Sequence, residues 1–127
     1  MTRAHRGPRR LLLCIDDNQA ILAYERFLFE KSGFIVVTAP SAQQGLRLVT
    51  MCSFDAVLLD YHMPEMNGHQ LATEIRSIRP ETPVIMFSGG EVPEKTRHLV
   101  DAVVLKTGAV GELLPTVTRL CNRSSPA

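Results

Sequence analysis

Five residues that could bind a metal ion or a phosphoryl group follow short apolar runs in the 127-residue sequence. They are Asp16 and Asp17 after Leu11–Ile15, Asp60 after Ala56–Leu59, Ser88 after Val84–Phe87, and Lys106 after Ala102–Leu105. Three carboxylates gathered at one place repel one another unless a cation neutralises them. Mg²⁺ prefers oxygen ligands and takes one or two carboxylates together with phosphate oxygens and water. These residue types therefore indicate a Mg²⁺ site, provided that the fold brings them together.

The same residues meet the chemical requirements for phosphoryl transfer to an aspartate. A carboxylate is a competent nucleophile, and it needs no general base because it is already ionised near neutral pH. What remains is to position the phosphoryl group and to neutralise its charge. The Lys106 ammonium group can pair with a phosphoryl oxygen, and the Ser88 hydroxyl can donate a hydrogen bond to the same anion.

Five apolar runs alternate with helix-like segments along the chain, which predicts alternating strands and helices. The run not yet mentioned, Phe34–Thr38, is rich in the β-branched residues that favour strands. A first helix should end near Gly33, a typical C-terminal cap. Ser41 and Gln44 have the spacing of a capping box and predict the start of a second helix. The apolar residues at helical spacing in the first helix are Ile21, Leu22, Tyr24, Phe27, Leu28 and Phe29.

The second half of the chain continues the alternation with three more helical segments. A third helix should follow the loop over residues 61–67 and end before Pro80, because the residue before a proline disfavours the helical region. Two glycines and a proline interrupt the next segment and leave only Pro93–Leu99 for a short fourth helix. The last helix is predicted over Val110–Cys121, where Pro115 should kink or delay it.

This alternation predicts one α/β domain with a doubly wound parallel sheet and helices on both of its faces. In such sheets, ligands bind beyond the carboxyl ends of the strands. The carboxylates, the hydroxyl and the lysine would then share one edge. We expect a flexible basic tail over residues 1–10, the domain over residues 11–121, and a frayed C-terminus over residues 122–127.

Composition and charge narrow the function classes. With 45% hydrophobic and 21% charged residues, the chain is typical of a globular domain and not of a disordered or fibrous one. No apolar run approaches the ~18 residues of a membrane span, so we expect no membrane partner. Four arginines and no acidic residue lie in the first ten positions, which leaves ten basic against thirteen acidic residues in the rest. This acidic body argues against nucleic acid as the main partner. The three scattered cysteines, Cys14, Cys52 and Cys121, fit buried thiols in a reducing cytoplasm.

A more specific pattern comes from four segments of the sequence. They are IDD at Ile15–Asp17, LLDYHMPEMNG at Leu58–Gly68, FSGG at Phe87–Gly90 and VLK at Val104–Lys106. These segments resemble the receiver domain of two-component response regulators, and the resemblance covers nearly the whole chain from Leu11 to Cys121. It implies the flavodoxin-like strand order 2-1-3-4-5. It also implies a phosphoacceptor signalling domain of the stand-alone, single-domain type rather than an enzyme.

The resemblance assigns roles to the acidic residues. Asp60 matches the phosphoacceptor. Asp16 and Asp17 match the acidic pair that holds Mg²⁺, and Asp17 is expected to be the direct ligand of the two. The backbone carbonyl of His62 should complete the protein's share of the metal shell, together with Asp60.

The resemblance also assigns roles around the phosphoryl group and in the loops. Ser88 matches the switch hydroxyl, with Gly89 beside it in the switch loop, and Lys106 matches the lysine that contacts phosphate. Pro64 and Gly68 should shape the loop after Asp60, with Gly68 opening the next helix.

The sequence departs from the family's pattern at several positions. Val103 stands where the family usually has an aromatic switch residue, and a valine cannot swing between exposed and buried positions as a ring does. Thr107 stands directly after the lysine, where the family usually has a proline, often preceded by a cis peptide bond. A non-proline cis bond costs about 2.5–4 kcal/mol, so we expect a trans bond here. The interval from Ser88 to Lys106 is shorter than usual, which truncates the fourth helix.

Two residues carry competing interpretations. Asp17 alone could cap the first helix or bind a metal ion. The His62 side chain, two positions after Asp60, could modulate attack of water on a phosphoryl group or could be an exposed loop residue. Comparing phosphoryl lifetimes of wild type and His62→Ala distinguishes these alternatives.

Three functions therefore compete. The first is a receiver that a sensor histidine kinase or a histidine phosphotransfer protein phosphorylates on Asp60, with output through contact with an unknown downstream protein or as a possible dimer. The second is a pseudo-receiver, an interaction module that acts without phosphorylation, which Val103 and Thr107 favour. The third is a phosphohydrolase with an aspartyl nucleophile. Such enzymes have a DxD pattern, whereas this chain has Asp60-Tyr61-His62, so the receiver is the preferred hypothesis.

Overall fold

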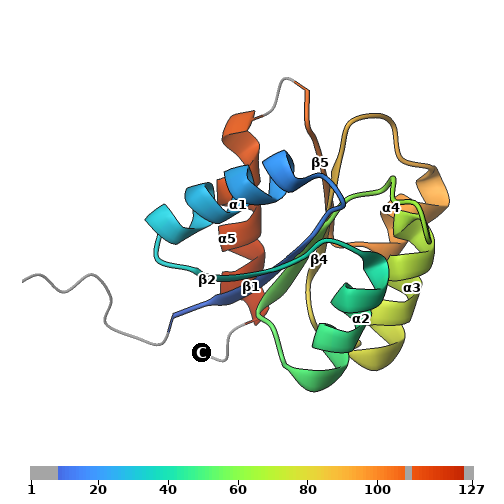
Figure 1. Cartoon of the computed structure of the whole chain (residues 1–127), viewed down its shortest axis with the longest axis horizontal. Helices are drawn as coiled ribbons and strands as arrows, with labels where there is room; N and C mark the ends of the chain where they lie inside the picture. The colour runs from blue at the N-terminus through green and yellow to red at the C-terminus, as the bar shows by residue number, and fades with distance from the viewer. Residues whose placement is uncertain (1–8, 108–109, 125–127) are drawn as a thin grey trace, which may run out of the picture.

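The five strands of the computed structural model are all parallel and pair in the order β2-β1-β3-β4-β5 (Figure 1). The structure describes residues 9–107 and 110–124. The strands are β1 (Leu11–Ile15), β2 (Ile35–Ala39), β3 (Ala56–Leu59), β4 (Val84–Ser88) and β5 (Ala102–Leu105). The helices are α1 (Gln19–Lys31), α2 (Ala42–Met51), α3 (Gly68–Ile78), α4 (Glu94–Leu99) and α5 (Leu113–Ser124), with a 3₁₀ turn, η1 (Val110–Glu112), before α5. The predicted fold class, strand order and short fourth helix are confirmed.

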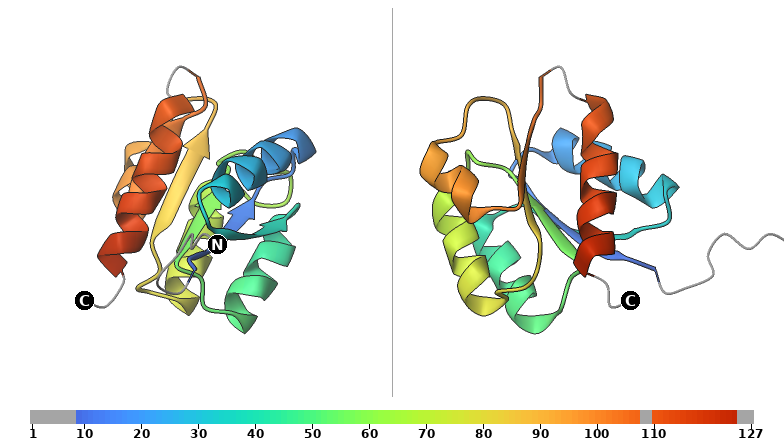
Figure 2. Two further views of the ribbon diagram at one scale, coloured as in Figure 1. Left: turned by 90° about the vertical axis from the view of Figure 1, so that its left-hand side faces the viewer. Right: turned by 180° about the vertical axis from the view of Figure 1, so that it is seen from behind.

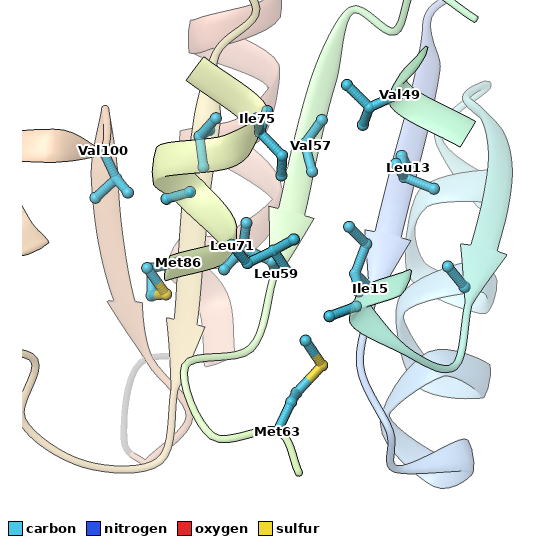
Figure 3. Close-up of a cluster of buried hydrophobic side chains, with 14 of the residues drawn as sticks. Leu13, Ile15, Val49, Val57, Leu59, Met63, Leu71, Ile75, Met86 and Val100 are labelled. Carbon is cyan, nitrogen blue, oxygen red and sulfur yellow. The ribbon is translucent and has the colours of Figure 1, made fainter. Parts of the chain in front are cut away.

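Helices cover both faces of the sheet, with α1 and α5 on one face and α2, α3 and α4 on the other (Figure 2). Strand β1 alternates between the two cores: Leu13 and Ile15 belong to the cluster under α2 and α3, and Leu12 and Cys14 to the cluster under α1 and α5. Figure 3 shows the first of these clusters. Because both faces are covered, a central strand must be apolar at every position, which explains the continuous apolar runs in the sequence.

Helix α1 ends in a Schellman motif, which confirms the predicted cap at Gly33. Gly33 has a φ of 95°, in the left-handed region that glycine adopts without strain. Its amide donates to the Glu30 carbonyl, and the Phe34 amide donates to the Phe29 carbonyl. The Phe29 and Phe34 rings meet edge to face at 5.2 Å. Phe34 thus closes the helix, so β2 begins one residue later than predicted, at Ile35.

The inward face of α1 differs from the predicted one. The buried residues of the helix are Leu22, Glu25 and Phe29, whereas Phe27 is 64% exposed. Phe27 instead lies under the Lys31 ammonium group, which is 5.1 Å from the ring centroid. The sequence pattern therefore found the helix but placed Phe27 on the wrong face, and it gave no sign that a glutamate is buried.

Helix α5 begins later and ends later than predicted. Pro115 lies in its first turn, where backbone amides have no acceptor within the helix, so the missing N–H costs no helical hydrogen bond. This confirms the predicted delay, since η1 precedes the helix. The helix continues to Ser124, so its predicted end at Cys121 was wrong, while the frayed C-terminus over residues 122–127 stays a prediction. Residues 125–127 lie outside the described residues.

The first residues of the chain are only partly described. Most of the predicted basic tail, residues 1–8, lies outside the described residues. Arg10 is not part of a free tail, because its carbonyl accepts a hydrogen bond from the Ile35 amide at 2.8 Å. The Arg10 guanidinium also donates to the Asn122 side chain in α5. Strand β1 is thus anchored from its first residues.

Four side chains fix the starts of three helices that follow the strand ends. Asn18 caps α1 by accepting hydrogen bonds from two backbone amides, and Ser41 caps α2 by accepting from the Gln44 amide. A reciprocal capping box opens α3, where Asn67 and Gln70 each accept from the other's amide. The Ser41 cap was predicted, and the two asparagine caps were missed.

Two remaining sequence predictions concern cysteines and membrane spans. Cys14 and Cys121 are buried as predicted, and Cys52 is only partly buried at the end of α2. Among the residues that the structure describes, no helix has both the length and the apolar character that crossing a bilayer requires.

Candidate functional site

Backbone hydrogen bonds extend the parallel ladder one residue past the strands and so place the polar residues level with one another. The Asp16 amide donates to the Ala39 carbonyl at 3.1 Å, and the Asp60 amide donates to the Ile15 carbonyl at 3.1 Å. The Lys106 amide donates to the Ser88 carbonyl at 2.7 Å. The positions of these side chains are therefore set by strand register and not by flexible loops.

Three carboxylates meet at this edge. Asp16, Asp17 and Asp60 each offer an oxygen, and these oxygens all lie within 4.8 Å of one another. Asp16 and Asp60 are buried, at 1% and 6% exposure, whereas Asp17 is exposed. Asp16 Oδ1 also accepts a hydrogen bond from the Asn18 amide at 2.9 Å. We call these three residues the acidic cluster.

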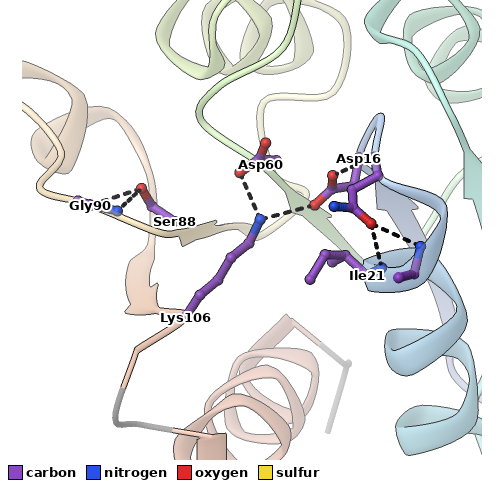
Figure 4. A network of polar contacts seen from close by, with 8 residues as sticks. Asp16, Ile21, Asp60, Ser88, Gly90 and Lys106 are labelled. Carbon is purple, nitrogen blue, oxygen red and sulfur yellow. Dashed lines mark hydrogen bonds and ion pairs between the residues drawn. The ribbon is translucent and has the colours of Figure 1, made fainter.

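Lys106 reaches the acidic cluster from β5 (Figure 4). Its Nζ lies 3.1 Å from Asp60 Oδ1 and 3.3 Å from Asp16 Oδ2. Because β4 lies between β5 and β3, the side chain must cross β4, and its ammonium group lies 5.6 Å from the centroid of the Phe87 ring. Lys106 therefore bridges the two buried carboxylates.

The charges of the site perturb each other. Burial raises the pKa of Asp16, and the charge of Asp60 raises it further, whereas the Asn18 amide and Lys106 act in the opposite direction. Burial acts to lower the pKa of Lys106, but its hydrogen bond with Asp60 and the charge of Asp16 outweigh burial and raise it. Lys106 is thus held in its charged form at neutral pH. With all groups ionised, three carboxylates and one ammonium group leave two negative charges.

This donor set fits a divalent cation with a preference for oxygen ligands. The cluster offers only carboxylate oxygens, which suit Mg²⁺ better than metals that prefer nitrogen or sulfur. One divalent cation would balance the two excess negative charges. Asp17, being exposed, leaves one side of the cluster open to water and to a substrate.

The Ser88 hydroxyl does not join the acidic cluster in this structure. Its Oγ donates to the Gly90 carbonyl at 2.8 Å and accepts from the Gly90 amide at 3.2 Å (Figure 4). The side chain is fully buried in this local turn. Of the five residues that the sequence singled out, four therefore come together, and the fifth is held in a neighbouring turn. Gly89, beside it, has open space where a side chain would begin.

The loop after Asp60 is fixed at both ends. The Gly68 amide donates to the Tyr61 carbonyl at 2.7 Å, and a Cβ on Gly68 would lie 2.7 Å from the Tyr61 Cα. Only glycine allows this close approach, which explains why Gly68 opens α3. Met63 anchors the middle of the loop in the core, while His62 and Pro64 are exposed.

The positions that depart from the family's pattern lie on β5 and just after it. Val103 is half-buried and packs against the core under α3 and α4. Thr107 is exposed, and the bond before it is trans, because the described part of the chain contains no cis peptide. The predicted trans bond is confirmed.

Two supporting residues escaped the sequence analysis. Asn18 takes the capping position of α1, which resolves the competing interpretations of Asp17 in favour of a free carboxylate in the cluster. Glu65 accepts a hydrogen bond from the Ala42 amide at 3.3 Å and so ties the loop to the start of α2. The N-x-x-Q spacing of Asn67 and Gln70 could have revealed the α3 cap.

Comparison with known proteins gives one family. A family model described as "Response regulator receiver domain" matches residues 12–114. The chain is 37% identical over 120 residues to "Transcriptional regulatory protein GlrR" of Escherichia coli (strain K12). That match covers 91% of this chain but only 27% of the relative, so the chain spans about a quarter of the relative's length.

Solved structures have the same fold. A response regulator receiver domain protein from Clostridium thermocellum is 30% identical, with a TM-score of 0.81 over 90% of this chain and 95% of that one. Response regulator protein TrrA from Thermotoga maritima, solved in complex with Mg(2+)-BeF, is 24% identical, with a TM-score of 0.82 over 87% of this chain and 98% of that one.

We expect Mg²⁺ to stabilise the domain through Asp17. At ten times its dissociation constant, the ion should raise the free energy of unfolding by about 1.4 kcal/mol. Without Mg²⁺, Asp17→Asn should be at least as stable as wild type, because Asp17 is exposed and its charge repels the other two carboxylates. It should bind Mg²⁺ at least roughly tenfold more weakly. Urea unfolding with and without Mg²⁺ measures both effects. Glu74→Gln, an exposed carboxylate outside the cluster, serves as control, and equal stabilisation of all three proteins would contradict the site.

Proposed function

The chain belongs to the response regulator receiver domain family, and from this premise we propose that it accepts a phosphoryl group on Asp60 in a Mg²⁺-dependent reaction. The observation that carries the proposal is the geometry of the acidic cluster. Asp60 lies beside two further carboxylates and 3.1 Å from a lysine that is held in its charged form. The Mg(2+)-BeF complex of TrrA supports the same chemistry for a protein of this fold.

Different residues of this chain attack the phosphoryl group and hold the metal ion during phosphoryl transfer. A carboxylate oxygen of Asp60 attacks phosphorus, so an O–P bond forms while the N–P bond of a donor phosphohistidine breaks and the imidazole departs. Asp16, Asp17 and Asp60, with the backbone carbonyl of His62, would hold Mg²⁺. When bound, the ion neutralises charge on the phosphoryl oxygens and on the carboxylates. Because the site is fixed by strand register, little reorganisation is needed at Asp60.

The new charge on Asp60 supplies the signal. A phosphoryl dianion attracts the Lys106 ammonium group and offers acceptors for a hydroxyl. Ser88 can satisfy one of them only by giving up its hydrogen bond to the Gly90 carbonyl. We propose that this exchange shifts the loop over residues 89–93 and the short helix α4, without a rotating ring at Val103. Pro64 and Gly68 shape the loop after Asp60, which stays in place. Gly89 belongs to the loop after Ser88, which shifts.

The partners follow from this chemistry. The donor is a sensor histidine kinase or a histidine phosphotransfer protein in the cytoplasm, and the output is a contact with a downstream protein or with a second copy of the domain. A pseudo-receiver remains the second candidate, because Val103 and Thr107 depart from the family's pattern at the switch position and after the lysine. An aspartyl phosphohydrolase fits less well, since Asp60-Tyr61-His62 lacks the second aspartate of the DxD pattern.

We expect acetyl phosphate and Mg²⁺ to add one phosphoryl group per molecule, because Asp60 is the carboxylate of the cluster that matches the family's phosphoacceptor, and it lies 3.1 Å from Lys106. Intact-mass spectrometry measures the gain. Asp60→Asn should abolish it, and Glu74→Gln should leave it unchanged. No mass gain in wild type would favour the pseudo-receiver, and unlimited turnover of the donor without a stable product would favour the phosphohydrolase.

We expect His62→Ala to lengthen the lifetime of the phosphoryl group. His62 is exposed two residues after Asp60, and its ring meets the Tyr61 ring edge to face at 4.9 Å. A neutral imidazole there can accept a proton from attacking water, and we expect its loss to slow dephosphorylation by roughly tenfold. Decay of the phosphorylated mass with time gives the lifetime. His98→Ala, an exposed histidine on α4, is the control, and equal lifetimes for wild type and His62→Ala would rule out this role.

A further inference from the structure

Glu25 is a buried acid that phosphoryl transfer does not use. It lies on the inward face of α1 between Leu22 and Phe29 and is only 2% exposed. Its Oε1 has no hydrogen-bond partner within the described structure. An isolated carboxylate is costly to bury, and the usual response of such a group is to take up a proton. The geometry therefore favours a neutral carboxylic acid.

The side chain of Cys14 faces Glu25 from β1. Cys14 is fully buried, and its thiol makes a side-chain hydrogen bond with Glu25. This hydrogen bond favours the charged form of Glu25, but burial outweighs it and raises the pKa of Glu25 to about 8. Burial also raises the pKa of the Cys14 thiol, and the nearby Glu25 raises it further. The Glu25 carboxyl and the Cys14 thiol, both titratable groups, thus contact each other in the buried interface between α1 and the sheet.

The acidic cluster begins next to the buried pair, because Asp16 follows Cys14, which faces Glu25, by two residues at the end of β1. The charges of Asp16 and Asp60 oppose ionisation of Glu25, and the charge of Lys106 favours it. Arg26, the next residue of α1, points to the sheet edge, where it binds Glu30, the Val36 carbonyl and Thr38. Among the described residues, the other buried side chains of the cluster under α1 and α5 are apolar, apart from the Cys121 thiol of α5.

We propose that Glu25 is a proton-binding site inside the domain and that its proton is coupled to the charge of the acidic cluster. A cation in the cluster favours release of the proton, and added negative charge favours its retention. Because such coupling is reciprocal, the protonation state of Glu25 alters the affinity of the cluster for charge by the same factor. Proton binding by Glu25 and its coupling to the acidic cluster do not depend on phosphorylation of Asp60. Its consequence, phosphorylation that depends on pH near 8, rests on the proposed function.

The sign of the effect on stability follows from the two states of the chain. Glu25 has a pKa of about 8 in the folded protein and an ordinary value of 4.5 when exposed by unfolding. Between these values the folded protein holds a proton that the unfolded chain has released. The stabilisation is therefore complete below the unfolded pKa and is lost as the pH rises through the folded one.

Urea unfolding of the metal-free protein across this range, with a chelator present, tests the proton site. One proton of difference changes the unfolding constant by up to about tenfold per pH unit, so wild type should weaken relative to Glu25→Gln by that factor between about pH 6 and pH 8. Glu30→Gln, an exposed glutamate on the same helix, should follow the wild-type profile. Parallel profiles for wild type and Glu25→Gln would overturn the proposal. Glu25→Leu, which also cannot ionise, repeats the comparison if the glutamine variant does not fold.

The same measurement in an Asp60→Asn background tests the coupling. Removing one negative charge from the cluster lowers the proton affinity of Glu25, so the extra pH dependence due to Glu25 should end at a lower pH. An unchanged profile would show that Glu25 binds a proton independently of the cluster and would overturn the coupling. Neither Mg²⁺ nor a phosphoryl donor is present, so failure here is distinguishable from failure of the proposed phosphorylation.

Discussion

Repulsion among Asp16, Asp17 and Asp60 is the constraint on which the rest of the site depends. Strand register holds the three carboxylates within 4.8 Å, and Lys106 crosses β4 to offset part of their charge. Placing three like charges together at one edge of the sheet does not stabilise the fold, so the arrangement indicates a function. In the proposed function, this unbalanced charge would give the domain its affinity for a cation and, through the cation, for a phosphoryl group.

The surrounding structure keeps this unfavourable arrangement rigid and leaves one element free to respond. Asn18 holds the turn after Asp16, and the close contact of Gly68 with Tyr61 fixes the loop after Asp60. The backbone of Ser88 is held by β5, but its hydroxyl is hydrogen-bonded only to Gly90 among the contacts of the described residues. In the proposed function, the rigid part of the site around Asp16 and Asp60 takes up the charge of the phosphoryl group. The Ser88 hydroxyl responds by exchanging its hydrogen bonds with Gly90.

The sequence predicted the parts of this arrangement that depend on chain order. Apolar runs located the strands, and parallel strands necessarily bring Asp16, Asp60 and Lys106 to one edge. The face of α1 was not predictable in the same way, because its apolar residues surround most of the helix. Docking placed Glu25 inside and Phe27 outside, an exchange that a propensity pattern cannot reveal. The orientation of the Ser88 hydroxyl could not be predicted either. Its Oγ can donate to the Gly90 carbonyl or, in the proposed phosphorylated form, to an oxygen of the phosphoryl group on Asp60.

In the proposed switch, charge that arrives at Asp60 draws the Ser88 hydroxyl away from Gly90 while Val103 stays in place. Nuclear magnetic resonance of the domain with Mg²⁺ and beryllofluoride, a mimic of the phosphoryl group, tests it most directly. We expect a large change in the Gly90 amide signal, through loss of its hydrogen bond to Ser88, with little change in the Val103 methyl signals. An unchanged Gly90 amide in protein saturated with beryllofluoride, or a large displacement of Val103, would contradict it.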